Sequence, residues 1–366
     1  MGSCFLALFD INPKETPKAL FGREEELDEL VHLIKEKRWV ALIGPRMVGK
    51  TSLIKVANTK LDHTGIYVNL WGAKSTKGLL NALVHSMNDS KGLLQKIRDG
   101  VRRIEGLSLG PSGISVSVPK KPLTTTWDLL NLVGQQSGKC VIELDEVQEL
   151  AVVSGHLLRV LANIFNTHTN IVFVFTGSMF GLMKTLTEPK SSSSPLYGRP
   201  PAKLYLRPFD RKKSMDFLHR GFEEYKVKVS DDMIGRAVEE RLDGLPGWLT
   251  LYGNNIAVRR LSEEKALDET VSEGLKIVRD ELNHYLKERA RSAHLAALKA
   301  CATSARWSEV KGAIDARRKN SARVNDATVH NVIASLKSGM LIDEQQGAYR
   351  VIDPMLRTLL LTTRIS

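Results

Sequence analysis

The stretch ALIGPRMVGKTSL, residues 41–53, decides the fold that we expect for this chain. Residues 44–51 fit the pattern G-x-x-x-x-G-K-[ST], in which a glycine-rich loop wraps its backbone N–H groups around a phosphate. The apolar residues 40–43 predict a buried strand before the loop, and a helix is predicted from about residue 50. This is the context that a phosphate-binding loop requires, because the N-terminus of the helix adds its positive dipole end.

The side chains of the loop have predicted roles at a bound nucleotide. Lys50 is expected to bridge the β- and γ-phosphates, and the Thr51 hydroxyl to ligate Mg²⁺. The predicted nucleotide-binding residues of the loop are Gly44, Pro45, Arg46, Met47, Val48, Gly49, Lys50, Thr51 and Ser52.

Length and composition bound the class of protein. The 366 residues suffice for two or three domains of roughly 100–200 residues each, and 42% hydrophobic with 26% charged residues is ordinary for a globular protein. The three cysteines have no paired spacing, so we expect neither disulfides nor zinc, and a reducing cytoplasm. The first ten residues contain no basic region and only a short apolar run, so neither a signal peptide nor a membrane span is expected.

The net charge of +12 is concentrated near the C-terminus. Residues 284–366 contain 14 Lys and Arg against 7 Asp and Glu, which gives +7 and leaves +5 for the other 283 residues. Such a basic region favours an acidic partner such as nucleic acid, although a well-solvated surface can carry the same charge.

The order of predicted elements indicates an α/β fold. Strands are predicted at residues 66–70, 141–144, 171–175 and 204–206, alternating with helices, which predicts a parallel sheet with helices on both faces. Residues 107–118 alternate around a Pro-Ser-Gly turn and predict a hairpin that edges this sheet. Residues 211–283 predict helices broken at 244–247. Helices near 290–303, 308–316 and 326–338, the last capped by Asp326, precede a hairpin and predict a winged helix.

Two carboxylates end the predicted strand at residues 141–144. Asp145 is expected to hold Mg²⁺ together with Thr51, and Glu146 to polarise the attacking water. Glu143 interrupts the apolar run on the same side as Asp145, where it is expected to pair with a cation beneath the loop.

Further candidates follow the next strands. Thr176 and Ser178 could sense the γ-phosphate, although simple turn chemistry explains them equally well. Arg199 could neutralise charge in the transition state, within the chain or across a subunit interface, and the alternative for it is a surface ion pair.

These motifs, in this order, carry a family resemblance. Phe21-Gly-Arg-Glu, the phosphate loop, Leu144-Asp-Glu-Val-Gln148, Thr176-Gly-Ser178, Pro195-Leu-Tyr-Gly-Arg199 and Gly244-Leu-Pro-Gly-Trp248 precede the winged helix. The chain resembles the archaeal ATPase family within the STAND class of AAA+-related P-loop NTPases, from about Leu8 to its end. The resemblance implies a core at residues 1–207, a helical lid at 208–283 and a winged-helix domain at 284–366.

The resemblance also implies ligands and roles. It implies ATP or ADP with Mg²⁺, bound in a slowly hydrolysing switch, often with tightly held ADP. Phe21, Gly22 and Arg23 resemble the segment that lies against adenine, Pro246 the proline that reports nucleotide state, and Arg199 the arginine that the family carries after Tyr-Gly. The chain departs from the family at Glu143, where an apolar residue is expected, and at Met47, where a second basic residue is frequent.

The partner of the winged helix stays open at this level. For duplex DNA, the third helix offers Thr328, His330, Asn331, Ser335 and Lys337, with Arg317, Arg318, Lys319 and Arg323 before it. Asp343 and Glu344 in the wing oppose DNA, so packing on the chain's own core or on a protein partner is the rival. A small-molecule kinase is disfavoured, because no motif for an acceptor pocket is found.

Overall fold

The computed structural model describes residues 8–61, 63–117, 120–177, 182–189, 191, 194–287, 289–317 and 324–363. The chain divides into two compact units. The sheet unit contains Arg23–Ile43 and Lys50–Leu206, and the helical unit contains Met1–Gly22, Gly44–Gly49 and Arg207–Ser366. The predicted phosphate loop is thus divided between the units, because Lys50 begins the first helix after it in the sheet unit.

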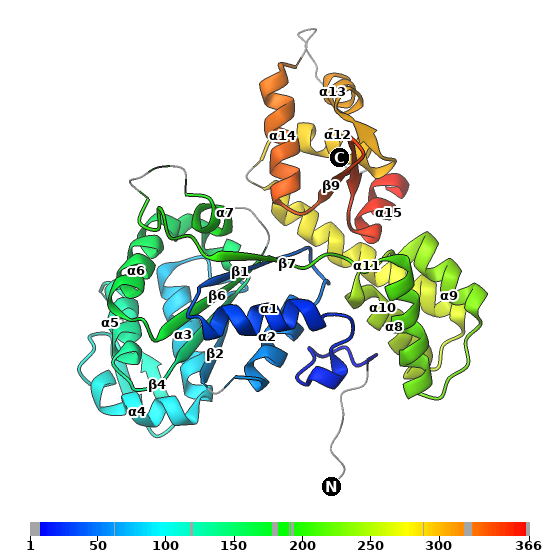
Figure 1. Ribbon diagram of the computed structural model, residues 1–366. Coiled ribbons are helices and arrows are strands. Elements are labelled where there is room, and N and C mark those ends of the chain that lie inside the picture. Colours follow the sequence, from blue (N-terminus) through cyan, green and yellow to red (C-terminus); the bar gives the residue numbers. More distant parts are fainter. Residues whose placement is uncertain are drawn as a thin grey trace. The chain divides into compact units, whose positions relative to one another are not determined.

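The core of the sheet unit is a five-stranded parallel sheet in the order β2-β5-β6-β1-β7 (Figure 1). Its strands are β1 (Val40–Ile43), β2 (Thr64–Asn69), β5 (Cys140–Asp145), β6 (Ile171–Gly177) and β7 (Ala202–Tyr205). Every residue of β1, β5 and β6 is buried, as expected for a parallel sheet covered on both faces. The predicted parallel α/β fold is therefore confirmed.

Helices and one helical turn flank this sheet: α1 (Glu24–Lys35), α2 (Lys50–Thr59), α3 (Thr76–Asp89), α4 (Lys91–Val101), α5 (Pro122–Gly134), η2 (Val147–Val153), α6 (Ser154–Thr167) and α7 (Leu182–Thr187). In α1, Leu27, Leu30, Val31 and Ile34 form the buried stripe that their spacing predicts. Full burial of each such side chain contributes roughly 1.5–3 kcal/mol.

The predicted hairpin forms, but it does not edge the main sheet. β3 (Leu107–Gly110) and β4 (Gly113–Val116) make a separate two-stranded sheet. Asn88 of α3 donates to the Ile114 carbonyl and accepts from the Ile114 N–H, both at 2.8 Å. The expectation was wrong because a side-chain amide on a helix satisfies this backbone, which alternation along the sequence cannot reveal.

The first part of the helical unit consists of η1 (Pro17–Ala19), α8 (Arg211–Glu224), α9 (Asp231–Ala237), the π-helical turn η3 (Val238–Leu242), α10 (Pro246–Ala257) and the long α11 (Glu263–Leu286). Phe9 packs between α8 and α10, where Gly221 and Gly253 leave room for its ring. The Phe9 carbonyl accepts a hydrogen bond from Asn254 at 2.8 Å. The N-terminal segment is therefore part of this helical core.

The C-terminal region has the predicted order of helices and hairpin. It contains α12 (Arg291–Ala302), β8 (Ala305–Arg306), α13 (Trp307–Asp315), α14 (Asp326–Ser338), β9 (Ile342–Gln345), β10 (Ala348–Val351) and α15 (Pro354–Thr362). The strands form an antiparallel sheet in the order β8-β10-β9. We call residues 291–363 the winged-helix region, after the arrangement that the sequence predicts for them. None of the described helices is long and apolar enough to cross a membrane.

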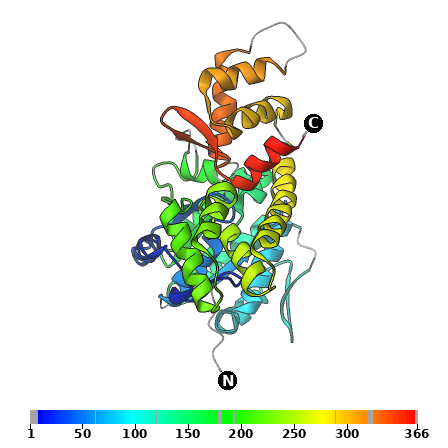
Figure 2. The same ribbon diagram turned by 90° about the vertical axis from the view of Figure 1, so that its right-hand side faces the viewer.

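Two details of this region differ from the prediction. The N-cap of α14 is Asn325, whose side chain accepts from the Thr328 N–H at 2.8 Å, and not Asp326, which is the first helical residue. Helix α15 was not predicted. It packs along α11 (Figure 1, Figure 2), where Gly274 leaves room for Met355. The predicted basic residues Arg318, Lys319 and Arg323 lie outside the described residues.

Candidate functional site

Asp145 is the centre of a group of hydroxyls in the sheet unit. It ends β5 and is 5% exposed. Its Oδ2 accepts hydrogen bonds from the Tyr67 hydroxyl at 2.6 Å and the Thr51 hydroxyl at 3.0 Å, and its Oδ1 accepts from the Thr176 hydroxyl. The sheet order places β2 and β6 on either side of β5, so parallel strands bring the ends that carry Tyr67 and Thr176 to one edge. The predicted Asp145, Thr51 and Thr176 are thus brought together.

Tyr67 is the member of this group that the sequence analysis missed. Burial, followed by the nearby Asp145 carboxylate, raises the pKa of the phenol, so Tyr67 stays a neutral donor. In the strand register Tyr67 lies opposite Glu143, so its side chain reaches Asp145 diagonally, one pleat further on. Only the pairing of β2 with β5 identifies this residue, because the two lie 78 positions apart.

The arrangement suits a small divalent cation held together with phosphates. Thr51 and Asp145 offer hard oxygen atoms 3.0 Å apart at the start of α2. In the described part of the chain, no group of three or more His, Cys, Asp or Glu side chains gathers as a metal site. Mg²⁺ commonly takes one or two protein ligands and completes its shell with water and phosphate oxygens, so the residues present fit it. Lys50, also at the start of α2, is only 9% exposed.

Glu146 follows Asp145 in a constrained conformation. Its φ of 60° lies in the left-handed region, which costs a non-glycine residue about 1–2 kcal/mol. Its N–H points to Asp145 Oδ1 at 3.1 Å and to Thr176 Oγ1 at 3.4 Å, and its carboxylate accepts a hydrogen bond from the Gln148 amide. Strained backbone of this kind persists where the surrounding contacts fix it, and it clusters at functional sites.

Glu143 lies one pleat below Asp145 and is buried within β5. Burial raises the pKa of its carboxyl to about 8, against a smaller opposing effect of the hydrogen bond with Asn58. Lys55 lowers the pKa further, and Glu143 Oε2 has no hydrogen-bond partner among the described residues. Burial therefore favours the protonated form of this carboxyl.

The first part of the phosphate loop belongs to the helical unit. Met47 has a φ of 62°, and its carbonyl accepts a hydrogen bond from the Gly247 N–H at 2.8 Å. A Cβ on Gly247 would come within 2.8 Å of the Met47 side chain, so this approach requires glycine. Arg46 forms an ion pair with Glu281 of α11. Gly44, Pro45 and Val48 are buried, whereas Gly49, Thr51 and Ser52 are half-buried.

The residues predicted to lie against adenine are distributed over both units. Phe21 packs edge-on against Phe209 and Phe217, and the Gly22 carbonyl accepts from Lys213 at 3.2 Å, all in the helical unit. Arg23, in the sheet unit, is buried at the start of α1 and forms an ion pair with Glu26 at 2.8 Å. The contact of these residues with a nucleotide base stays a prediction.

Arg199 is held by residues of its own unit. Its guanidinium donates to Asn166, approaches the Pro195 carbonyl at 3.5 Å and lies 5.3 Å from the centre of the Phe165 ring. Asn166 and Phe165 belong to α6, so the structure brings Arg199 to this helix. Ser178, the other predicted sensor, lies outside the described residues.

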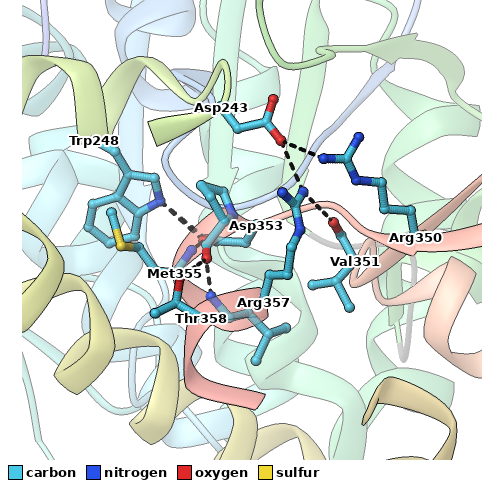
Figure 3. A network of polar contacts seen from close by, with 10 residues as sticks. Asp243, Trp248, Arg350, Val351, Asp353, Met355, Arg357 and Thr358 are labelled. Carbon is cyan, nitrogen blue, oxygen red and sulfur yellow. Dashed lines mark hydrogen bonds and ion pairs between the residues drawn. The ribbon is translucent and has the colours of Figure 1, made fainter. Parts of the chain in front are cut away.

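A second polar network joins the helices around Pro246 to the winged-helix region within the helical unit (Figure 3). Trp248, fully buried in α10, donates from its indole to Asp353 at 3.3 Å. Asp353 caps α15 and accepts the N–H of Met355 at 2.7 Å. Burial raises the pKa of Asp353 to about 6.

An ion pair stands beside this contact. Arg357 of α15 donates to Asp243 at 2.9 Å and to the Val351 carbonyl at 3.0 Å, and Arg350 approaches Asp243 at 3.5 Å. We call Asp243, Trp248, Asp353 and Arg357 the clasp. Its first two members flank Pro246, the first residue of α10, and the sequence analysis missed the other two, Asp353 and Arg357, because α15 was not predicted.

Known protein families and solved structures share this architecture. Residues 20–251 match the model of a family described as an ATPase domain predominantly from Archaea. This match covers more than half of the chain, so the chain belongs to that family, and the resemblance inferred from the motifs is confirmed. It is a nucleotide-binding ATPase domain with the P-loop fold.

Solved structures extend the likeness over nearly the whole chain. A Walker-type ATPase from Pyrococcus abyssi is 25% identical, with 97% of this chain and 99% of that chain covered and a TM-score of 0.75. The ORC2 protein of Aeropyrum pernix, solved as ADPNP–ADP complexes, is 16% identical, with 96% of each chain covered and a TM-score of 0.61. Cdc6p from Pyrobaculum aerophilum is 12% identical, with 96% of each covered and a TM-score of 0.51. The last two show the fold alone. No curated protein sequence matches the chain.

Proposed function

We propose that this protein is an ATP-binding, slowly hydrolysing switch whose nucleotide state is relayed through the helices around Pro246 to the winged-helix region. One observation carries the proposal. The Gly247 N–H donates to the carbonyl of Met47 in the phosphate loop, and the next residue, Trp248, donates to Asp353 of the winged-helix region. A loop that would contact phosphates and a region that could contact a partner are therefore joined by consecutive residues.

The roles of the side chains follow from their positions. Lys50 and the loop N–H groups would bind the phosphates, and Thr51 and Asp145 would hold Mg²⁺, which neutralises developing phosphate charge when bound. Glu146 would accept the proton of the attacking water. Arg199 would stabilise transition-state charge after leaving its contacts on α6. Phe21, Gly22 and Arg23 would lie against the base, and Pro246 would report the nucleotide state.

We also propose that the chain belongs to the STAND class and that it has three parts, divided at residues 207 and 283.

A ligand shifts a conformational equilibrium only by its differential affinity for the two states. ATP and ADP differ at the γ-phosphate, so the differential contact belongs at the phosphate loop. The Met47–Gly247 hydrogen bond couples that loop to the clasp, and this supports a relay within the helical unit.

DNA binding by α14 is the alternative, and two contacts weigh against it. The Ser335 hydroxyl is hydrogen-bonded to Tyr285 of α11 at 2.8 Å, and Lys337 is paired with Glu344 of the wing at 2.7 Å. Both side chains belong to the face that would enter a major groove, so they would have to exchange these partners for DNA. His330 and Asn331 stay exposed on that helix.

The first experiment is ATP turnover by the purified protein, with and without duplex DNA, at low and high salt. Phosphate contacts make DNA affinity fall steeply with salt. Slow turnover that DNA does not change supports a switch whose winged-helix region packs on the chain's own core or on a protein partner. Stimulation by DNA that high salt removes would replace it with the DNA-binding ATPase.

A second measurement tests the relay itself. Hydrogen exchange of α15 is compared between the ADP-bound protein and Glu146→Gln loaded with ATP, and the relay predicts different protection in the two states. Trp248→Phe, which removes the indole donor, should reduce that difference. Trp307→Phe is the control, because the Trp307 indole N–H has no hydrogen-bond partner among the described residues. Equal protection in both nucleotide states would refute the relay.

A further inference from the structure

Gln148 makes a contact with Glu146 that the roles assigned above do not use. It lies in η2, the turn that follows Glu146, and its Nε2 donates to Glu146 Oε2. An amide turned the other way would set two oxygen atoms against each other, so this hydrogen bond fixes which end of the amide faces the carboxylate. The side chain of Glu146 is thus held at the end of β5 by a neutral donor two residues along the chain.

The other end of the Gln148 amide explains a glycine on the neighbouring strand. A Cβ on Gly177 of β6 would overlap Gln148 Oε1, and Gly177 has a φ of 150°, which also favours glycine. Gly177 follows Thr176, whose hydroxyl donates to Asp145. Two consecutive residues of β6 therefore support both carboxylates. Thr176 donates to Asp145, and Gly177 leaves room for Gln148, which donates to Glu146.

The position of the Gln148 side chain also carries an energetic cost. Its Oε1 is buried and has no hydrogen-bond partner among the described residues. A buried, unsatisfied carbonyl opposes folding, and such groups are rare in folded proteins. A smaller or apolar side chain would avoid this penalty, so the contact of Nε2 with Glu146 is the feature that accounts for a glutamine here.

We propose that Gln148 is a positioning residue that holds the Glu146 carboxylate where it can accept a proton from the attacking water. This inference rests on the proposed function, in which Glu146 is the general base. A base must stay within hydrogen-bond reach of the proton that it removes, and a small displacement of a reacting group lowers the rate strongly. Glu146 is half-buried and has three rotatable side-chain bonds, so without Gln148 it would turn toward solvent.

The test is single-turnover hydrolysis of labelled ATP by Gln148→Ala and by Gln148→Glu, which keeps the shape but cannot donate when ionised. We expect kcat to fall at least tenfold in both, with KM for ATP and the Kd for ADP within about twofold of wild type. Gln148→Ala added to Glu146→Gln should cause no further loss, because the residue acts only through Glu146. A wild-type rate in Gln148→Ala, or multiplied losses in the double variant, would overturn the proposal.

A stability measurement tests the spatial fit between Gln148 and Gly177. Gly177→Ala should lower the melting temperature, and Gln148→Ala in that background should restore part of it by removing the overlapping side chain. A double variant no more stable than Gly177→Ala would refute the spatial fit.

Turnover by Glu146→Gln alone distinguishes a failure of the proposed general base from a failure of the role of Gln148. Wild-type turnover in that variant refutes Glu146 as the base, whereas an inactive Glu146→Gln with an unaffected Gln148→Ala refutes only the role of Gln148.

Discussion

Two aspartates of this protein, Asp145 and Asp353, are each surrounded by hydrogen-bond donors of a different kind. Asp145 receives three hydroxyls, from Tyr67, Thr51 and Thr176, besides one backbone N–H. Asp353 receives an indole N–H and two backbone N–H groups. A hydroxyl oxygen can donate to a carboxylate and still offer lone pairs to a cation, whereas an N–H can only donate. The hydroxyls around Asp145 can therefore admit a metal ion. The N–H groups around Asp353 instead form a fixed structural contact between α10 and the start of α15.

The largest expected effect is on ATP turnover, and it distinguishes hydrolysis from nucleotide binding at the site around Asp145. Glu146→Gln should reduce turnover at least about 100-fold, because general base catalysis contributes roughly 10²–10⁴-fold. ATP affinity should change little, since the amide keeps the shape of the carboxylate. Filter binding of labelled ATP and single-turnover hydrolysis measure the two quantities. Turnover at the wild-type rate would place the base elsewhere.

Removal of the loop lysine should act on affinity instead. Lys50→Ala should weaken ADP binding by about 100-fold, because a buried ammonium that pairs with phosphate contributes more than an ordinary hydrogen bond. Titration calorimetry with ADP measures the loss. Lys55→Ala, in the same helix α2, is the control and should bind ADP normally. Unchanged ADP affinity in Lys50→Ala would remove the nucleotide site from this loop.

The clasp should respond in stability rather than in chemistry. Arg357→Met removes a hydrogen-bonded charge from Asp243 and a donor from the Val351 carbonyl, a loss of about 2 kcal/mol. The melting temperature should fall by about 5 °C. Arg350→Met is the matched control, because Arg350 reaches the same Asp243 at 3.5 Å with a half-exposed side chain. Its melting temperature should fall by no more than about 2 °C. Equal losses would show that Arg357 contributes no more than a surface charge.

Tyr67→Phe tests whether the hydroxyls around Asp145 prepare a cation site. The ring is kept, and only the donor at 2.6 Å from Asp145 is lost. We expect the half-saturating Mg²⁺ concentration for nucleotide binding to rise about fivefold, corresponding to about 1 kcal/mol. Mg²⁺ titration of labelled nucleotide binding gives this value. Tyr205→Phe on β7 is the control, since Tyr205 is 44% exposed. An unchanged Mg²⁺ requirement would assign Tyr67 to packing alone.

The last prediction is a pH dependence of stability at Asp353. The pKa of Asp353 is raised to about 6 in the folded protein, above its ordinary value of 3.8. Between these two values the folded state retains a proton that the unfolded chain releases, so this group makes stability fall as pH rises. Asp353→Asn removes that proton but remains a good helix N-cap. The melting temperature of wild type minus that of the variant should therefore decrease from about pH 4 to pH 6 and stay constant above. A difference independent of pH would contradict the raised pKa.

The sequence analysis predicted the elements and motifs that depend on a local pattern of residues. The phosphate loop, the Asp145-Glu146 pair, the helical stripe of α1 and the three helices before the hairpin all follow from neighbours along the chain. No role was predicted for Tyr67, nor for Gln148 beyond its place in the motif Leu144-Asp-Glu-Val-Gln148, because their relevance depends on atoms of Asp145 and Glu146 and on room left by Gly177. Helix α15 was missed, and its Asp353 and Arg357 acquire a role only beside Trp248 and Asp243.

The sequence by itself determined that this chain forms a parallel α/β core with a phosphate loop, because the spacing of glycines and apolar residues dictates local backbone geometry. Only the tertiary structure decided the strand order β2-β5-β6-β1-β7, and with it which side chains surround Asp145. The same holds for the clasp, whose members lie up to 114 residues apart. Contacts of this kind depend on which elements pack together, and that choice is made by the whole buried core and not by any one segment.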